Sequence, residues 1–219
     1  MQNSKYELYI FDMDGTLLDT SPGILRAIRH TIDSFHKEMP EDDVLKKFIG
    51  PPLRLSFAAL PDVVMNEVDD MVVAFRKQYS EHELFNASLY DGIQQLCECL
   101  HNNNVKMAVA TNKPETFAKK IIGHFKLDKY INVVCGADEE GILTKADLIY
   151  RAMEMSQTYD KSKAVMVGDT MGDAEAAYEC GLDFIGVKYG FGLSDNKEDV
   201  IRTKAIRMVA SPRDIYRMI

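Results

Sequence analysis

The stretch Tyr9–Thr20, YIFDMDGTLLDT, gives the first indication of both the fold and the chemistry. It continues an apolar run, ELYIFD, that starts at Glu7, is rich in aromatic and β-branched residues and ends at a turn signal. Such a run predicts a short buried strand. Two aspartates, Asp12 and Asp14, stand where this strand ends, and each carboxylate raises the free-energy cost of charging the other. The pair therefore needs a cation, or a reaction that uses two acids.

Beyond residue 88, short apolar runs alternate with amphipathic segments of helical period. Further strands are predicted in VKMAVATN (105–112), INVVCG (131–136), KAVMVGD (163–169), DFIGVKYG (183–190) and AIRMVA (205–210). Strands that alternate with helices imply right-handed crossovers and a parallel sheet covered on both faces. The sequence thus predicts an α/β fold with a doubly wound, Rossmann-like parallel-sheet core.

The segment from about Pro40 to Ala87 differs from the rest of the chain in composition and pattern. It is acidic, amphipathic and poor in strand signals, and it is interrupted by Gly50-Pro51-Pro52 and by Pro61. A helix with Ser21 as its N-cap and Pro22 at its first position precedes it. We expect a core made of residues 1–16 and 88–219, with residues 17–87 inserted as a small helical domain.

Polar residues follow three of the core strands, where an open parallel sheet binds its ligands. The first strand delivers Asp12 and Asp14, the second Thr111 and Asn112, and the KAVMVGD strand Asp169, with Asp173 four residues on. Lys145 opens the helix after INVVCG and can reach the same edge. Four carboxylates repel one another unless a cation joins them, and oxygen-only ligands select a hard ion, for which Mg²⁺ suits best.

The remaining groups suit a phosphate. A lysine, a hydroxyl and the backbone N–H groups of the glycine-containing turn after Asp12 can cradle a tetrahedral anion beside the metal. One aspartate of the pair can then attack phosphorus as a nucleophile. The other can protonate the leaving alcohol and afterwards take a proton from the hydrolytic water.

Four segments, DMDGTLLD, VATN, the one around Lys145, and VGDTMGD, resemble in order the motifs of the haloacid dehalogenase superfamily. The resemblance covers the whole chain, including a helical cap inserted between the first and second motifs. It implies that Asp12 is the nucleophile and a Mg²⁺ ligand, and that Asp14 is the acid/base, binding the metal through its backbone carbonyl. Thr111 would bind the phosphoryl group, and Lys145 would neutralise it and orient Asp12.

The resemblance also implies that Asp169 ligates Mg²⁺ directly and that Asp173 holds the site, directly or through another ligand. The chain departs from the family's commoner Lys-Pro spelling, because Ala146 follows Lys145. Asn112, beside Thr111, is a further candidate for phosphate binding.

Asp14 favours phosphoryl transfer from oxygen, because the dehalogenase and phosphonatase branches lack an aspartate there. The helical insertion resembles that of phosphoglycolate phosphatases with a C1-type cap, and in its loop FIGPPLRLSF we expect Arg54 to contact the substrate. A β-phosphoglucomutase-like mutase, a pyrophosphatase and a 5'-nucleotidase share these motifs and stay open. A receiver-type domain that holds the phosphoryl group without turnover is the alternative from another class.

Composition limits the partners. A net charge of −8 argues against nucleic acid and anionic membranes, both of which favour basic surfaces, and leaves a small phosphorylated metabolite as the expected substrate. The opening residues lack a secretory signal, and no run of about 18 apolar residues occurs. We expect a cytoplasmic protein whose four cysteines are free thiols; the sequence carries no signal for an oligomeric state.

Overall fold

The computed structural model describes residues 5–138, 142–194 and 196–217. The chain divides into two compact units. The first combines Met1–Asp19 with Leu89–Ile219, and the second is Thr20–Ser88. No helix in the described part of the chain has both the length and the apolar character that crossing a bilayer requires.

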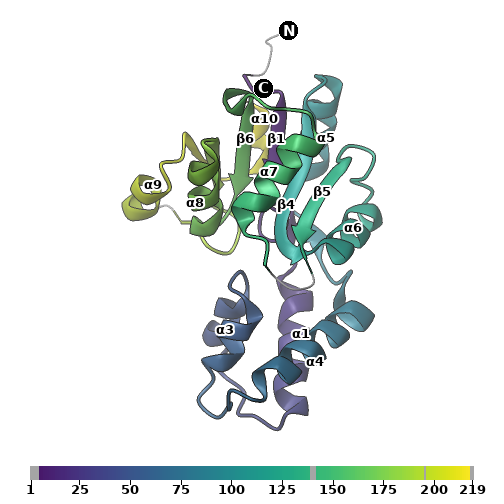
Figure 1. Ribbon diagram of the computed structural model, residues 1–219, viewed down its shortest axis with the longest axis vertical. Helices are drawn as coiled ribbons and strands as arrows, with labels where there is room; N and C mark the ends of the chain where they lie inside the picture. The colour runs from purple at the N-terminus through teal and green to yellow at the C-terminus, as the bar shows by residue number, and fades with distance from the viewer. Residues whose placement is uncertain (1–4, 139–141, 195, 218–219) are drawn as a thin grey trace. The chain divides into compact units, whose positions relative to one another are not determined.

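The first unit is built on a six-stranded parallel sheet, with strand order β5-β4-β1-β6-β7-β8 (Figure 1). From β1 the chain first builds the side of the sheet that holds β4 and β5, and then the side that holds β6, β7 and β8. The order therefore reverses at β1, and ligands of such sheets bind at the carboxyl ends of the strands near this point. The strands are β1 (Leu8–Phe11), β4 (Lys106–Pro114), β5 (Val133–Ala137), β6 (Ala164–Gly168), β7 (Asp183–Val187) and β8 (Arg207–Val209).

Helices cover both faces of this sheet, as the alternation of side chains along β1 requires. Leu8 and Ile10 belong to one buried cluster with residues of α7 and α8, and α7 crosses the face of the sheet turned to the viewer in Figure 1. Tyr9 and Phe11 point to the other face and stack on each other. This architecture confirms the predicted fold class. The helices of the unit are α5 (Ile93–Asn102), α6 (Glu115–His124), α7 (Lys145–Met155), η3 (Lys161–Lys163), α8 (Met171–Cys180), α9 (Lys197–Thr203) and α10 (Pro212–Tyr216).

The second unit is helical and has an aromatic core of its own. Phe57 lies between Phe48 and Phe75, with ring centroids 5.6 and 6.5 Å away, and Phe75 stacks on Tyr79. Helix α1 packs against α4. The helices of this second unit are α1 (Ser21–Ser34), α2 (Asp42–Leu45), η1 (Lys46–Phe48), α3 (Leu53–Ala58), α4 (Val68–Gln78) and the π-turn η2 (Tyr79–Glu83).

The structure differs from the sequence-based expectation in three local details. Helix α1 begins at Ser21 itself, and Thr20 holds the cap position that we assigned to Ser21. Pro22 tolerates this shift because no N–H in the first turn of a helix has an intrahelical partner. Helix α9 was not predicted, and neither was the separate two-stranded sheet of β2 (Leu18–Asp19) and β3 (Ser88–Leu89).

Candidate active site

The first strand ends in a tight turn that fixes Asp12. Its N–H continues the sheet by donating to the carbonyl of Val167, 2.9 Å away, and the residue is 6% exposed. The following turn closes through the N–H groups of Leu17 and Leu18 on the carbonyl of Met13. Gly15 has a φ of +87°, which disfavours any residue with a Cβ atom.

Asp169 follows β6 and is fully buried against this turn. One carboxylate oxygen accepts from the Thr16 hydroxyl at 3.2 Å, and the other accepts from the N–H of Phe191 at 2.7 Å. Two glycines permit the close packing, because a Cβ atom on Gly15 or Gly190 would lie 2.3 or 2.4 Å from the Asp169 side chain. The loop after β7 therefore helps to position the buried carboxylate of Asp169. Sequence reasoning did not anticipate this role of the loop.

Asp173 lies in the first turn of α8 and has two structural tasks. Its Oδ2 accepts from the N–H and the hydroxyl of Thr170, at 3.0 and 2.6 Å, and its own N–H donates to that hydroxyl, which makes a reciprocal capping box. Gly168 lets the side chain approach the end of β6, since a Cβ there would lie 2.5 Å from Asp173. The other carboxylate oxygen, Oδ1, forms an ion pair with a lysine.

That lysine is Lys145, the first residue of α7. Its Nζ lies 2.5 Å from Asp12 Oδ1 and 2.8 Å from Asp173 Oδ1, and its side chain is 10% exposed. Although burial opposes it, the charges of the two aspartates raise the pKa of Lys145, so the amine stays charged. Lys145 thus connects the end of β1 with the first turn of α8. This contact lies at the carboxyl edge of the sheet, where the sequence predicts Lys145.

Asp12, Asp169 and Asp173 can each present an oxygen within 4.8 Å of the others, and the three could hold a metal ion. Burial and the neighbouring carboxylates raise the pKa of Asp12 well above its usual value, although Lys145 opposes this. Burial and the charge of Asp173 likewise raise the pKa of Asp169 to about 7. Three carboxylates face one ammonium, so the donor set and its charge fit a hard divalent cation.

The carboxylate of Asp14 does not belong to this group of three and pairs with a different lysine. It lies 3.2 Å from Nζ of Lys113, whose side chain is only 7% exposed. The N–H of Lys113 also donates to the hydroxyl of Thr111, which is 1% exposed. Sequence reasoning missed Lys113, although a lysine two residues after a candidate phosphate-binding threonine was a usable signal. A role for the Asp14 carbonyl in metal binding stays a prediction.

The other two candidates stand apart from these contacts. Asn112 is exposed and lies within β4, two residues before its end. Arg54 lies in the helical unit, where its guanidinium pairs with Asp69 and both side chains are exposed. Their roles toward a substrate stay predictions.

A family model described as haloacid dehalogenase-like hydrolase matches residues 9–187, which include the acidic cluster, Lys145 and Lys113. The chain belongs to this family. The assignment confirms the resemblance that the motifs carried.

Relatives within the family differ in their named activities. The chain is 33% identical to the tyrosine-protein kinase PtkA of Mycobacterium tuberculosis over 86% of its length, but spans only 64% of that protein. It is 31% identical to a 5'-nucleotidase of Pseudomonas aeruginosa, covering 87% of this chain and 86% of the relative. It is also 31% identical to a phosphoglycolate phosphatase of Aquifex aeolicus, covering 83% and 84%.

A solved structure titled as a predicted phosphatase from Clostridium acetobutylicum aligns with a TM-score of 0.86 at 33% identity, covering 98% of each chain. Together with the family model, this likeness supports membership of the haloacid dehalogenase-like hydrolase family.

Proposed function

We propose that this protein is a Mg²⁺-dependent phosphomonoester hydrolase that acts on a small phosphorylated metabolite through a phosphorylated Asp12. The observation that carries the proposal is the position of Asp12. Its carboxylate is buried at the end of β1, contacts the ammonium of Lys145, and lies beside two more carboxylates that can share a metal.

The residues fit a magnesium ion. Asp12, Asp169 and Asp173 would hold it, with the Asp14 carbonyl as a further oxygen ligand, and this all-oxygen set is the kind that Mg²⁺ prefers. When bound, the ion supplies positive charge that offsets the negative charge of the phosphoryl oxygens and of the carboxylates. Asp169 is held in place at both oxygens, because one accepts from a hydroxyl and the other from a backbone N–H.

In the first step a carboxylate oxygen of Asp12 bonds to phosphorus and the bond from phosphorus to the ester oxygen breaks. Asp14 gives its proton to the departing oxygen, which leaves as an alcohol. Lys145 keeps Asp12 oriented, and the Thr111 hydroxyl, which accepts from the N–H of Lys113, retains its proton to donate to a phosphoryl oxygen.

In the second step the Asp14 carboxylate takes a proton from water as the water oxygen attacks phosphorus. The bond between phosphorus and Asp12 breaks, inorganic phosphate forms, and the Asp12 carboxylate is restored. Lys113 holds the Asp14 side chain through an ion pair, so the acid/base group has a fixed position two residues from the nucleophile.

The named activities of the relatives point to the class of substrate. The nucleotidase and phosphoglycolate phosphatase relatives both act, by their names, on small phosphorylated compounds, and this supports a substrate of that class here. We propose that residues 17–87 serve as a cap over a core of residues 1–16 and 88–219, and that Arg54 in the cap contacts the part of the substrate remote from phosphorus. The four free cysteines fit a reducing compartment, which supports a cytoplasmic location.

A phosphate-release screen over metabolite phosphates and p-nitrophenyl phosphate tests the proposal, with and without Mg²⁺. We expect sustained turnover that chelation abolishes. Asp12→Asn should remove turnover, and Asp14→Asn should slow it by about 10²–10⁴-fold. Wild-type rates in Asp12→Asn would overturn the nucleophile, and a single stoichiometric burst would favour a phospho-switch without turnover. Arg54→Ala should raise KM for the best metabolite but not for p-nitrophenyl phosphate.

A further inference from the structure

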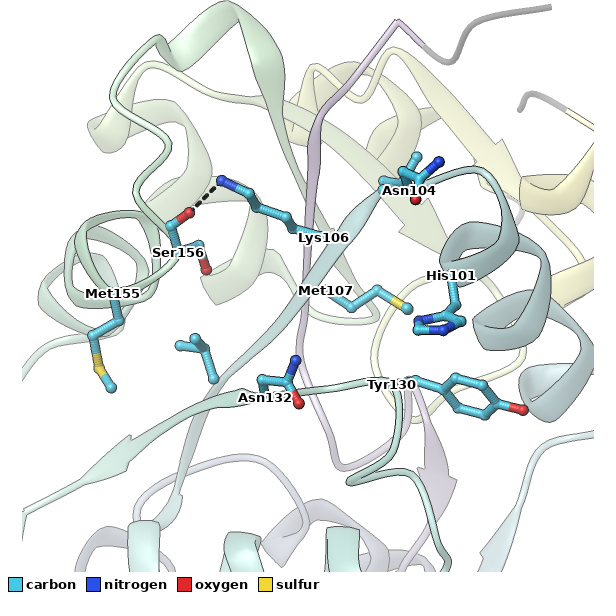
Figure 2. Close-up of a pocket in the computed structure, with 10 residues that line it drawn as sticks. His101, Asn104, Lys106, Met107, Tyr130, Asn132, Met155 and Ser156 are labelled. Atoms are coloured by element: carbon cyan, nitrogen blue, oxygen red, sulfur yellow. Dashed lines mark hydrogen bonds between the residues drawn. The ribbon is translucent and has the colours of Figure 1, made fainter. Parts of the chain in front are cut away.

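A pocket lies at the amino edge of the same sheet, opposite the edge that carries the acidic cluster. Helices α5 and α7 end there, and strands β4 and β5 begin there, so the pocket is lined from four elements (Figure 2). Its volume is about 410 Å³, which lies within the range of small-molecule sites. Lys106 in this pocket and Thr111 at the opposite edge are five residues apart on β4, a span of about 16 Å.

The charge of this pocket is opposite in sign to that of the protein. Lys106 is its one charged side chain, and no aspartate or glutamate lines it among the described residues. The Lys106 ammonium donates to the backbone carbonyl of Ser156 at 2.7 Å, as the dashed line in Figure 2 shows. An ammonium has three N–H donors, so two stay available for an anion.

Ser156 adds an unpaired buried hydroxyl. The residue is 8% exposed, and its Oγ is the one buried side-chain oxygen or nitrogen in the described part of the chain that lacks a hydrogen-bond partner. Its backbone is satisfied, because the N–H donates to Ala152 and the carbonyl accepts from Lys106. A buried polar atom left unpaired costs folding free energy, so this hydroxyl would gain from a hydrogen bond to a ligand.

The rest of the lining suits a flat ring. The rings of His101 and Tyr130 lie 5.6 Å apart at an interplanar angle of 60°, and the side chain of Met107 extends toward them in Figure 2. Thioether and aromatic groups both pack favourably on planar π-systems. The carboxamides of Asn104 and Asn132 offer donors and acceptors for polar atoms on such a ring.

We propose that this pocket binds a small planar organic anion, an aromatic or heteroaromatic carboxylate. Its carboxylate would pair with the Lys106 ammonium and accept from the Ser156 hydroxyl after a small opening at that residue. Its ring would pack against Met107 and the His101–Tyr130 pair. Such a ligand carries no phosphoryl group, so this site is distinct in chemistry from the candidate active site and stands independently of the proposed hydrolase activity.

Nuclear magnetic resonance on protein labelled at methionine methyls and side-chain amides tests this proposal. Nicotinate, benzoate and orotate are the probes, nicotinamide is the neutral match for nicotinate, and acetate is the anion without a ring. We expect saturable shifts at Met107, Met155 and Asn132 with at least one ring carboxylate in the millimolar range or below. Binding of nicotinamide and acetate should be weaker by about tenfold or more. No saturable shift with any of the three ring carboxylates, or equal binding of nicotinamide, would overturn the proposal.

Two variants test the anion end. Lys106→Met should weaken binding of the ring carboxylate by about tenfold. Lys163→Met, an exposed lysine near the same edge that pairs with Glu7, should leave binding unchanged and serves as the matched control. Ser156→Ala should weaken binding while the free protein keeps or gains thermal stability, because the lost hydroxyl has no partner to leave behind. If both Lys106→Met and Ser156→Ala bound the ring carboxylate with unchanged affinity, neither group would contact the ligand and the proposal would be overturned.

Discussion

Helices α7 and α8 begin with the same pattern, threonine followed three residues later by aspartate, yet the two aspartates have different surroundings. Thr144 and Asp147 form a reciprocal capping box, as Thr170 and Asp173 do, and the matching hydrogen bonds differ in length by only about 0.1 Å. Asp147 is exposed, whereas Asp173 is 2% exposed and its second oxygen contacts Lys145. The local motif specifies a helix start, and the surroundings decide whether the same acid can also serve chemistry.

The difference follows from the length of the segment that connects each strand to the helix after it. Only Asp169 and Thr170 separate β6 from α8, so Asp173 is pressed against Gly168 at the strand end. Residues 138–144 separate β5 from α7, and there the first residue of the helix, Lys145, turns inward. Two positions along a helix rotate the side chain by about 200°, which directs Asp147 to the opposite side. One helix thus contributes its cation to the site and the other its acid.

The largest effect that tests this comparison is expected from Lys145→Met. Removing the cation leaves Asp12 and Asp173 buried without their ion-pair partner, and breaking a buried pair costs about 3–5 kcal/mol. Loss of a preorganised positive donor should also lower kcat by about 10²–10³-fold. Phosphate release and thermal unfolding measure the two effects. Lys119→Met, which breaks an exposed pair with Glu115, is the control and should change stability by less than about 0.5 kcal/mol. If Lys145→Met changed stability and turnover as little as Lys119→Met, Lys145 would have no role in the site.

Asp173→Asn should have a smaller effect on activity. The amide oxygen can still accept from Thr170 and keep the cap, but the charge toward Lys145 and the metal is lost. Changes of this kind around a metal site cost about 10–100-fold in affinity or activity. We therefore expect a higher Mg²⁺ requirement and slower turnover, measured by titrating Mg²⁺ against phosphate release.

Stability separates the two tasks of Asp173. In the metal-free protein the substitution relieves the repulsion among three crowded carboxylates but also removes one of the two partners of Lys145, so the unfolding temperature should change little while activity falls. An unchanged Mg²⁺ requirement together with a lower unfolding temperature would show that Asp173 is only a cap, like Asp147.

Much of this arrangement could be predicted from sequence because parallel strands bring their carboxyl ends to one edge. Asp12, Asp169 and Lys145 lie at or directly after recognisable elements, so their convergence follows from topology alone. Helix α9 was missed because KEDVIRT is short and has no apolar stripe. Its existence depends on the Asn196 cap, whose side chain accepts from Asp199.

The parts of the site that sequence reasoning missed depend on local backbone geometry. Lys113 reaches Asp14 because β4 continues to Pro114 with a register shift after Thr111, an irregularity that no residue pattern announces. The N–H of Phe191 reaches Asp169 from the loop after β7, and that loop approaches closely only because Gly190 carries no side chain. Backbone donors of this kind carry no side-chain signal, so they become visible only in the folded structure.

The smallest effect is expected from Asp147→Asn, the matched change at the start of α7. Its carboxylate makes no contact with the acidic cluster, so kcat, KM and the Mg²⁺ requirement should equal those of the unsubstituted protein. The hydroxyl and N–H of Thr144 lower the pKa of Asp147, which means that folding favours its charged form. Its contribution to stability is therefore present above the unfolded-state value near 4 and is lost as the pH falls through the lower folded-state value.

The unfolding temperature of Asp147→Asn should accordingly lie slightly below that of the unsubstituted protein at pH 7. The two should converge once the pH lies below the lowered folded-state pKa of Asp147, where both side chains are neutral. Circular dichroism melts across this range measure the difference. A loss of turnover in Asp147→Asn as large as that in Asp173→Asn would break the comparison, because the exposed cap of α7 would then matter to the chemistry as much as the buried cap of α8.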